Sequence, residues 1–493
     1  MINKKRIIQN SVLGVLLVVV GFSTACKKNS TQPAPIDPVV TPPTRAELTK
    51  DSIYLYTQQT YFWNVGMPTL QVFNPRGYAT TVDEVNAIRK LSSNGGMDKY
   101  SFIDDGTVAT EIGGVAGDFG FSVFFNSASD LRVKYVYATS PAATQGLKRG
   151  YQITKINDVT DINTTDASIA KIVDAIFGKA ATVTLTIKKP DGTSQDVSVS
   201  KATYNINPVL FTHTYTVGTK KVGYIVFNSF TDNSLPQLDA AFATFAADGA
   251  KELIVDLRYN GGGAVSTSEA FTNLIAPSSQ NGNVMFTYYF NQTMQDGKAT
   301  ILQNQKFIGT DNKLHSYFDF NYKPTVAAGN QTVFKKRGSL EGITRVYFLV
   351  TGGTASASEL LMNNLKPVVD VKLIGRQTYG KPVGFFSIHI DKSDLYIPQF
   401  QTKNQLSSGE YFGGFTPDRI INDDVTKEFG DPTEGMLSQA LYYSQNGQFT
   451  SYVHDNAISS ATPFSTTKMV DLTGKLDHSF KGMVDNTHPK FKK

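Results

Sequence analysis

Two apolar segments that run into glycines are the features that most constrain how this chain can fold. Residues 254–257 lead into the run Gly261–Gly263, and residues 345–350 lead into Gly352 and Gly353. Strand-like and helical patterns alternate throughout the surrounding region: strands at residues 222–227, 252–257, 345–350 and 371–374, a helix at 235–247, and a second helix that follows 345–350 and ends at about Leu365. Alternation of short apolar strands with helices predicts an α/β fold for residues 205–447.

The first glycine cluster, Gly261–Gly263, can have either a catalytic or a purely structural role. Glycine tolerates φ > 0 and lets backbone N–H groups approach a ligand, so such a turn can bind an anion or an oxyanion. Three glycines also suit a plain tight loop. The segment alone leaves both interpretations open.

The second cluster is followed by three hydroxyl side chains, Thr354, Ser356 and Ser358. A serine at the start of a helix lies where the helix dipole and free N–H groups favour developing negative charge. The same residue types are also good helix N-caps, so capping is the structural alternative.

A serine nucleophile needs a base. None of the six histidines lies in a recognisable catalytic motif, and no Gly-x-Ser-x-Gly sequence surrounds the serines. Lys381, in Tyr379-Gly380-Lys381-Pro382, is another candidate, because burial can keep a lysine neutral. A single lysine in a turn is otherwise usually solvated.

Three segments in this order resemble the tail-specific, or C-terminal processing, serine peptidases: Asp-Leu-Arg-x-Asn-x-Gly-Gly from Asp256, Thr-Ala-Ser-Ala-Ser-Glu from Thr354, and Tyr-Gly-Lys from Tyr379. In that family a lysine 25 positions after the serine is the base, and here Lys381 follows Ser356 by 25 positions. The resemblance implies a crotonase-like α/β core with Ser356 as nucleophile and Lys381 as base. It implies an oxyanion hole made by Ala357 N–H and one N–H from Gly262 or Gly263.

One position departs from the family. Many members carry a Gln four residues after the lysine, which orients it, whereas this chain has Phe385. Either another group or apolar packing holds the lysine, or activity is weakened. A non-catalytic peptide- or lipid-binding protein that keeps the fold is therefore the alternative function.

The resemblance extends upstream to a PDZ-like domain. Asp118, Phe119, Gly120 and Phe121 resemble its carboxylate-binding loop, which presents backbone N–H groups to the C-terminus of a peptide. Residues 140–157 resemble the helix and strand that follow, with Tyr151 in place of the usual Asp. The alternative is a plain glycine hairpin, and a pure adaptor working through this loop is a further functional possibility.

The N-terminus predicts export. A basic start at Lys4, Lys5 and Arg6 precedes an apolar run of 11 residues, Val12–Phe22, too short to span about 30 Å of hydrocarbon but typical of a signal peptide. Ser23-Thr24-Ala25-Cys26 resembles a bacterial lipobox, although the family usually has Leu where this chain has Ser23. Cys26 is thus predicted to be lipidated; an ordinary secretory signal with an incidental cysteine is the alternative.

Composition narrows the function further. Cys26 is the only cysteine, which excludes a disulfide scaffold, a Cys-based zinc site and a cysteine nucleophile elsewhere. Removing residues 1–25 takes away three positive charges and lowers the formal charge from +5 to +2, so nucleic-acid binding has little support. We expect no metal and no cofactor.

These observations predict an exported, lipid-anchored serine endopeptidase of the bacterial cell envelope that acts on polypeptides, selected through their C-termini. Aromatic residues near the N-terminus, such as Tyr54 and Trp63, belong either to a cap or interface domain or simply to the core. The predicted domains are a signal peptide (1–25), a lipidated cysteine with a Pro-rich tether (26–44), a helical segment (45–110), a PDZ-like domain (111–203), a peptidase domain (204–448) and an unassigned tail (449–493).

Overall fold

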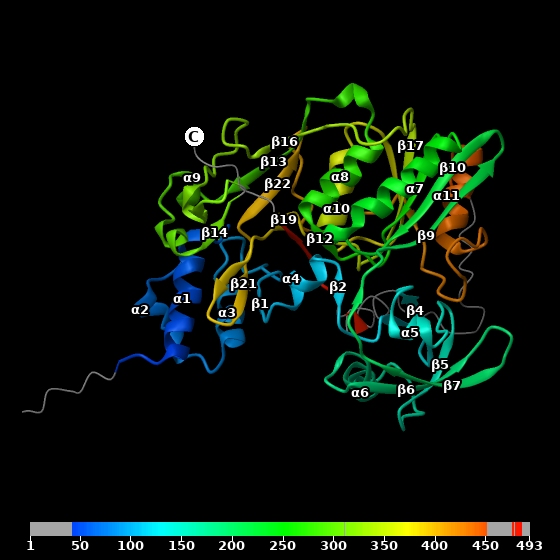
Figure 1. Ribbon diagram of the computed structural model, residues 1–493, viewed down its shortest axis with the longest axis horizontal. Coiled ribbons are helices and arrows are strands. Elements are labelled where there is room, and N and C mark those ends of the chain that lie inside the picture. The colour runs from blue at the N-terminus through cyan, green and yellow to red at the C-terminus, as the bar shows by residue number, and fades with distance from the viewer. Residues whose placement is uncertain (1–41, 310, 451–475, 478, 486–493) are drawn as a thin grey trace, which may run out of the picture. The chain divides into compact units, whose positions relative to one another are not determined.

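A six-stranded sheet forms the centre of the fold in the computed structural model, which describes residues 42–309, 311–450, 476, 477 and 479–485 (Figure 1). Its strands, in spatial order, are β23 (Arg419–Ile420), β18 (Asp370–Gly375), β17 (Arg345–Val350), β11 (Glu252–Asp256), β10 (Lys220–Phe227) and β9 (Val209–Val217). β9 pairs antiparallel with β10, and the other neighbours pair in parallel. The strands predicted in this region are confirmed.

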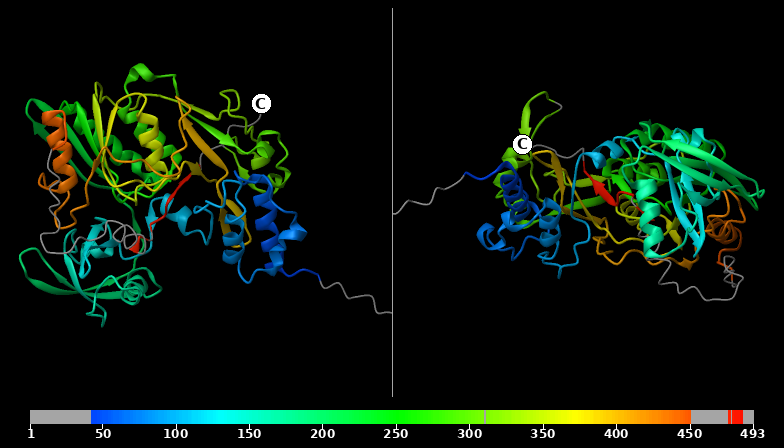
Figure 2. Two further views of the ribbon diagram at one scale, coloured as in Figure 1. Left: turned by 180° about the vertical axis from the view of Figure 1, so that it is seen from behind. Right: turned by 90° about the horizontal axis from the view of Figure 1, so that it is seen from below.

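Helices cover both faces of this sheet. α7 (Leu235–Ala247), α8 (Val265–Ile275) and α10 (Ala357–Leu365) lie on one face, and α11 (Gly435–Asn446) lies on the other (Figures 1 and 2). Successive side chains of a strand point to opposite faces. In β17, accordingly, Val346, Phe348 and Val350 join the core cluster of α8 and α10, whereas Tyr347 and Leu349 join that of α11.

The insertion that sequence patterns did not place, residues 278–342, builds much of a second, antiparallel sheet. That sheet consists of β16 (Gln331–Val333), β13 (Val284–Phe290), β22 (Phe400–Asn404) and β19 (Val383–Gly384). The insertion also holds α9 (Gln292–Gln295) and a hairpin of β14 (Lys306–Ile308) and β15 (Leu314–Ser316). Its aromatic residues, including Phe286 and Tyr288, are buried in the main core.

The N-terminal segment is mostly helical, as predicted, and packs on the same core. Its elements are α1 (Arg45–Thr60), α2 (Leu70–Phe73), α3 (Thr81–Arg89), β1 (Phe102–Asp104) and α4 (Thr107–Ile112). Tyr54 and Trp63 are buried in the main cluster, which confirms the core-packing interpretation of these aromatics. β1 joins β21 (Ser393–Tyr396), which in turn pairs with β20 (Ile388–Ile390).

A five-stranded antiparallel sheet with its own hydrophobic cluster accounts for residues 121–200. Its strands are β3 (Phe121–Ser127), β4 (Asp130–Val136), β5 (Gln152–Ile156), β6 (Thr182–Lys188) and β7 (Ser194–Ser200), accompanied by α5 (Pro141–Thr144) and α6 (Asp166–Phe177). The chain enters and leaves this unit through the paired strands β2 (Val115–Ala116) and β8 (Tyr204–Asn205).

The described part of the tail contains one strand that sequence patterns missed. β24 (Gly482–Val484) pairs with β12 (Gly262–Ala264), the strand formed by the first glycine cluster. Cys26 and most of the predicted tether lie outside the described residues. Among the helices of the described part of the chain, none is long and apolar enough to span a membrane.

Candidate active site

Ser356 lies at the junction between β17 and α10, immediately before the first residue of the helix. Its backbone has φ +59° and ψ −104°, an unfavourable conformation for a residue with a Cβ, and such strain is concentrated at functional sites. The side chain is completely buried, and its Oγ has no hydrogen-bond partner among the described residues. Ser356 and Glu359 have the arrangement of a capping box at the start of α10, and a buried hydroxyl on a strained junction also fits a nucleophile.

Lys381 lies in the turn before β19 and is also completely buried. Burial lowers the pKa of Lys381 well below the ordinary value of 10.5; Asp98 and Glu359 raise it, and Lys99 lowers it further. Its Nζ donates a hydrogen bond to the carbonyl oxygen of Lys481 (2.7 Å), so in this structure the amine points to the tail and is not bonded to Ser356 Oγ.

Phe385 takes the place of the family's usual Gln, and its ring centroid lies 3.7 Å from Lys381 Nζ. The ring removes water from one side of the amine, which favours the neutral form, while its π-face attracts the charged form. Burial is the largest influence on this pKa, and Phe385 contributes part of the apolar surface around the amine.

Glu359 connects the nucleophile segment with the base segment. Its carboxylate accepts the backbone N–H groups of Ser356 and Lys381 on one oxygen, both at 2.8 Å. The other oxygen accepts the N–H of Gly380 (2.8 Å) and the hydroxyl of Thr378 (2.6 Å). Burial raises the pKa of Glu359, and these four hydrogen bonds oppose that rise. The sequence motif contained Glu359, but no role was predicted for it.

The first glycine cluster lies against the start of α10. Gly262 and Gly263 have φ of +114° and +136°, which confirms that the turn requires residues without a side chain. The position that a Cβ on Gly262 would take lies 3.1 Å from Ala357 N, so the turn and the Ala357 N–H are neighbours, as an oxyanion hole requires.

Asn260 organises this turn and was not singled out from the sequence. Its side-chain oxygen accepts the Gly262 N–H (2.9 Å), and its amide donates to the carbonyl of Phe227 (2.9 Å). Its own carbonyl accepts the Ser358 hydroxyl (3.0 Å) and the Ala355 N–H (3.1 Å). These bonds fix the two glycine-rich turns to each other.

A buried cluster of charges lies behind the same turn. Arg258, 1% exposed, bonds the carboxylates of Asp256, Asp423 and Glu434. Arg149, from the five-stranded unit, reaches Asp423 at 2.8 Å. Burial alone raises the pKa of Asp423, but Arg149 and Arg258 together lower it to about 2, so the carboxylate stays charged.

The predicted peptide-binding loop, Asp118 to Phe121, precedes β3. Gly120 has φ +81°, and its N–H donates to Asp118 Oδ1 at 2.8 Å. Phe119 and Phe121 are buried in the cluster of the five-stranded unit. A peptide carboxylate would therefore have to displace the Asp118 side chain to reach the Gly120 N–H.

Sequence and fold comparisons relate this chain to known proteins. The model of peptidase family S41 matches residues 221–421. A probable CtpA-like serine protease of Staphylococcus epidermidis is 25% identical over 275 residues, 55% of this chain and 46% of that protein. The carboxy-terminal processing protease CtpA of Bacillus subtilis is 28% identical over 245 residues, 49% of this chain and 42% of that protein. This chain spans about half the length of these curated relatives.

A solved structure from Bacteroides fragilis NCTC 9343, assigned to the S41 proteases, shares the fold with a TM-score of 0.57. It is 22% identical, and the match covers 84% of this chain and 100% of that one. The mixed α/β fold is thus confirmed. Residues 221–421 form a peptidase family S41 domain, and the chain is a homologue of the C-terminal processing proteases.

Proposed function

We propose that the chain is a serine endopeptidase in which Ser356 is the nucleophile and Lys381 the general base. Neutral Lys381 takes the proton of Ser356 as Oγ attacks a peptide carbonyl, and then protonates the leaving amine. Water hydrolyses the resulting acyl-enzyme and releases the second product. Ala357 N–H stabilises the tetrahedral oxyanion. Because Asn260 takes the Gly262 N–H, Gly263 is the better candidate for the second donor.

The observation that carries this proposal is the shared carboxylate of Glu359. One oxygen accepts the backbone N–H groups of both Ser356 and Lys381, so the two segments are held at a defined separation. Burial of Lys381 provides the second requirement, an amine whose pKa is low enough to be neutral when it must accept a proton.

A serine-directed fluorophosphonate tests the proposal on the full chain. Prolonged incubation is expected to label one site, and peptide mapping should assign the label to Ser356. Ser356→Ala should remove the label, whereas Ser358→Ala, which changes the neighbouring serine of the motif, should leave the label in place. Absence of labelling in the folded wild-type chain and also in folded variants that expose Ser356 would contradict the assignment.

A catalytically inactive peptide-binding protein is the second candidate. Two observations favour it: Phe385 replaces the orienting Gln, and Ser356 Oγ has no bond to Lys381. The same fluorophosphonate experiment separates the two, because a pure binder would bind peptides while Ser356 remained unlabelled.

The pH profile of peptide hydrolysis is expected to reflect Lys381. Only the neutral amine accepts the serine proton, so kcat/KM should rise with pH through the pKa of Lys381, at a pH well below 10.5. Lys99 lowers the pKa of Lys381 by charge repulsion. Lys99→Met should therefore move the inflection to higher pH, as measured by full pH–rate profiles of both proteins. A profile without a rising limb below pH 10.5 would contradict a lysine base.

Glu359→Gln is expected to lower kcat by about 10²-fold with little change in KM, because small displacements of reacting groups cost about that much. The carboxylate of Glu359 accepts four hydrogen bonds, two on each oxygen. In the Gln variant an NH2 group, which cannot accept hydrogen bonds, would face two of these donors, so the Ser356 and Lys381 segments would shift. Steady-state kinetics measure the split between kcat and KM. A purely structural role would instead be indicated if a folded Glu359→Ala variant lost as much kcat as Glu359→Gln and if Glu359→Asp restored none of it.

Residues 111–203 are proposed to act as a PDZ-like domain that captures the C-terminus of a polypeptide through the loop Asp118–Phe121. The antiparallel sheet with its own hydrophobic cluster supports this assignment. Weaker binding of peptides with an amidated C-terminus is the expected outcome in a titration of the full chain.

Export and lipid anchoring through Cys26 are proposed from the N-terminal sequence. Cys26→Ala is expected to abolish incorporation of radiolabelled palmitate and to move the protein from the membrane fraction to the soluble fraction. The protein should leave the membrane because Cys26 is the predicted site of acylation. Stable anchoring needs two or more acyl chains, and each buried CH2 contributes about 0.8 kcal/mol to membrane binding. Unchanged membrane association of the Cys26→Ala protein would contradict the anchor.

A further inference from the structure

The strand β24, Gly482–Val484, lies directly on the glycine turn of the candidate active site. It pairs in parallel with β12, with Gly482 opposite Gly262 and Met483 opposite Gly263. The Gly482 N–H donates to the carbonyl of Gly261 at 3.0 Å. This strand is the red segment in Figures 1 and 2.

The other edge of β24 is bonded to the segment that follows Lys381. Phe385 N–H donates to the Met483 carbonyl at 3.0 Å, and Asp485 N–H donates to the Phe385 carbonyl at 2.8 Å. The tail is therefore held by main-chain hydrogen bonds on both edges, between the glycine turn and the base segment. Main-chain pairing of this kind is how proteins bind extended peptides by strand addition.

The tail also contacts the groups that would perform catalysis. Lys381 Nζ donates to the Lys481 carbonyl at 2.7 Å. The position of a Cβ on Gly262 lies 2.1 Å from the Gly482 carbonyl oxygen and 3.1 Å from Ala357 N, so this carbonyl lies beside the proposed oxyanion hole. Ser356 is completely buried, so a substrate cannot reach it in this arrangement of the chain.

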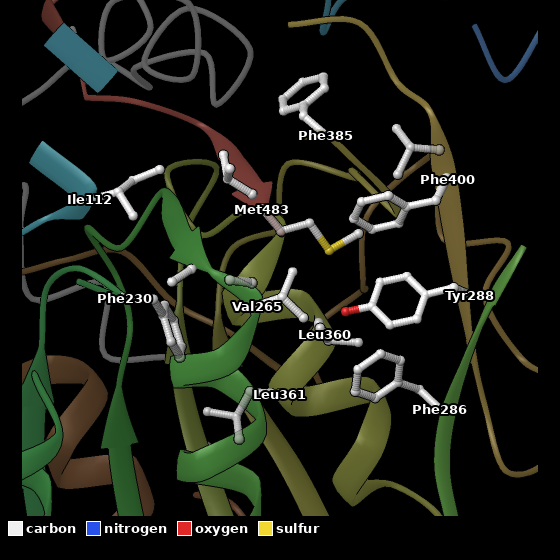
Figure 3. Packing of buried hydrophobic residues seen from close by; sticks show 14 of the residues in the cluster. Ile112, Phe230, Val265, Phe286, Tyr288, Leu360, Leu361, Phe385, Phe400 and Met483 are labelled. Carbon is white, nitrogen blue, oxygen red and sulfur yellow. The ribbon is translucent and has the colours of Figure 1, made fainter. Parts of the chain in front are cut away.

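Side chains of the strand fill apolar space as those of a bound peptide would. Met483 is completely buried, and Figure 3 shows its side chain among Val265, Leu360 and Phe400. Val484 is 5% exposed. The channel thus accepts glycine at position 482, a long apolar side chain at 483 and a branched apolar side chain at 484.

Electrostatic interactions of Asp477 with two lysines fix the start of the tail segment. Lys481 Nζ lies 2.9 Å from a carboxylate oxygen of Asp477. Lys134 of β4 also attracts Asp477, and these two lysines lower the pKa of Asp477 although burial raises it. Asp477 is therefore a charged anchor between the tail and the five-stranded unit.

We propose that residues 479–485 are a built-in occupant of the substrate channel, which blocks Ser356 and separates it from Lys381 until the segment is released. The inference rests on the proposed peptidase function. It assigns to the channel an extended peptide chain, bound alongside β12, as its ligand.

The test is the rate at which a fluorophosphonate labels Ser356 in the full chain. Met483→Asp places a carboxylate in the apolar cluster, and releasing the tail is the simplest way for that charge to reach water. Labelling should become at least about 10-fold faster, since a tenfold change needs only about 1.4 kcal/mol. Met97→Asp, which puts the same charge on a methionine that is 66% exposed, is the matched control and should label at the wild-type rate.

A synthetic peptide of residues 477–487 provides the complementary measurement. Added to Met483→Asp, it should slow labelling again in a saturable manner, because it can refill the channel. Should Met483→Asp fail to fold, as judged by circular dichroism, Gly482→Pro replaces it: this variant removes the N–H that donates to Gly261.

Equal or slower labelling of the released variants would overturn the inference and would mean that the tail completes the active site instead of blocking it. Such a result would leave the peptidase assignment intact, since Ser356 would still react. Absence of Ser356 labelling in every folded variant would contradict the peptidase proposal itself, and the blocking role with it.

Discussion

Replacing Ser356 with Ala or Lys381 with Met is expected to lower kcat/KM for peptide hydrolysis by about 10³-fold or more. Removal of the nucleophile or of its base lowers activity by this factor in serine hydrolases, because no other group in the site can attack the carbonyl or accept the proton. The two losses should not add in the double variant, since the residues act as a unit. The measurement is steady-state hydrolysis of an unfolded polypeptide, in the wild-type background and in the Met483→Asp background.

Lys366→Met is the matched control for Lys381. Burial lowers the pKa of Lys366 as well, and its Nζ lies 3.7 Å from the ring centroid of Phe415, the same distance as between Lys381 and Phe385. Lys366 is the residue immediately after α10, at the opposite end of that helix from Ser356, so activity should be retained. Turnover by Ser356→Ala at the wild-type rate would show that the dyad is assigned to the wrong residues.

Arg258→Met is expected to lower the free energy of unfolding by about 3–5 kcal/mol, the usual cost of removing one partner from a buried ion-pair network. Arg258 is 1% exposed and bonds three carboxylates, those of Asp256, Asp423 and Glu434. Methionine has a similar length but leaves this group of negative charges with less compensation. Urea unfolding of the full chain, monitored by circular dichroism, measures this change in the free energy of unfolding.

Arg337→Met provides the comparison with a surface pair. Arg337 bonds Asp239, but both side chains are about 40% exposed, so the change should stay within about 1 kcal/mol. If both variants lost the same stability, the buried network behind the glycine turn would have no special role in holding the fold.

Local sequence patterns predicted the α/β region with good accuracy. The helix predicted at 235–247 and the strand predicted at 345–350 have the same bounds in the structure. Both segments combine a strong apolar pattern with clear ends, and such patterns depend on neighbours in sequence. Ser356 likewise lies at the start of a helix, as its position after Gly353 predicted.

Contacts between distant segments escaped prediction. Glu359 joins residues from Ser356 to Lys381, and Asn260 joins the glycine turn to β10 and α10, but neither role leaves a signal beyond a polar residue in a motif. In the insertion 278–342, β13 pairs with β16 of the same segment and also with β22, more than a hundred residues later. Periodicity within a segment cannot reveal a partner that is supplied by another segment.

The sequence by itself determined which candidate groups the protein carries: a serine predicted at a strand–helix junction, a lysine 25 positions later, a run of three glycines, and a single cysteine near the N-terminus. Only the tertiary structure decided how those groups are arranged. It buried Lys381 beside Phe385, bonded Glu359 to the backbone of both Ser356 and Lys381, and placed β24 on the glycine turn. The difference has a physical cause, because burial and main-chain pairing arise between segments far apart in the chain, whereas residue type and local spacing are properties of each segment alone.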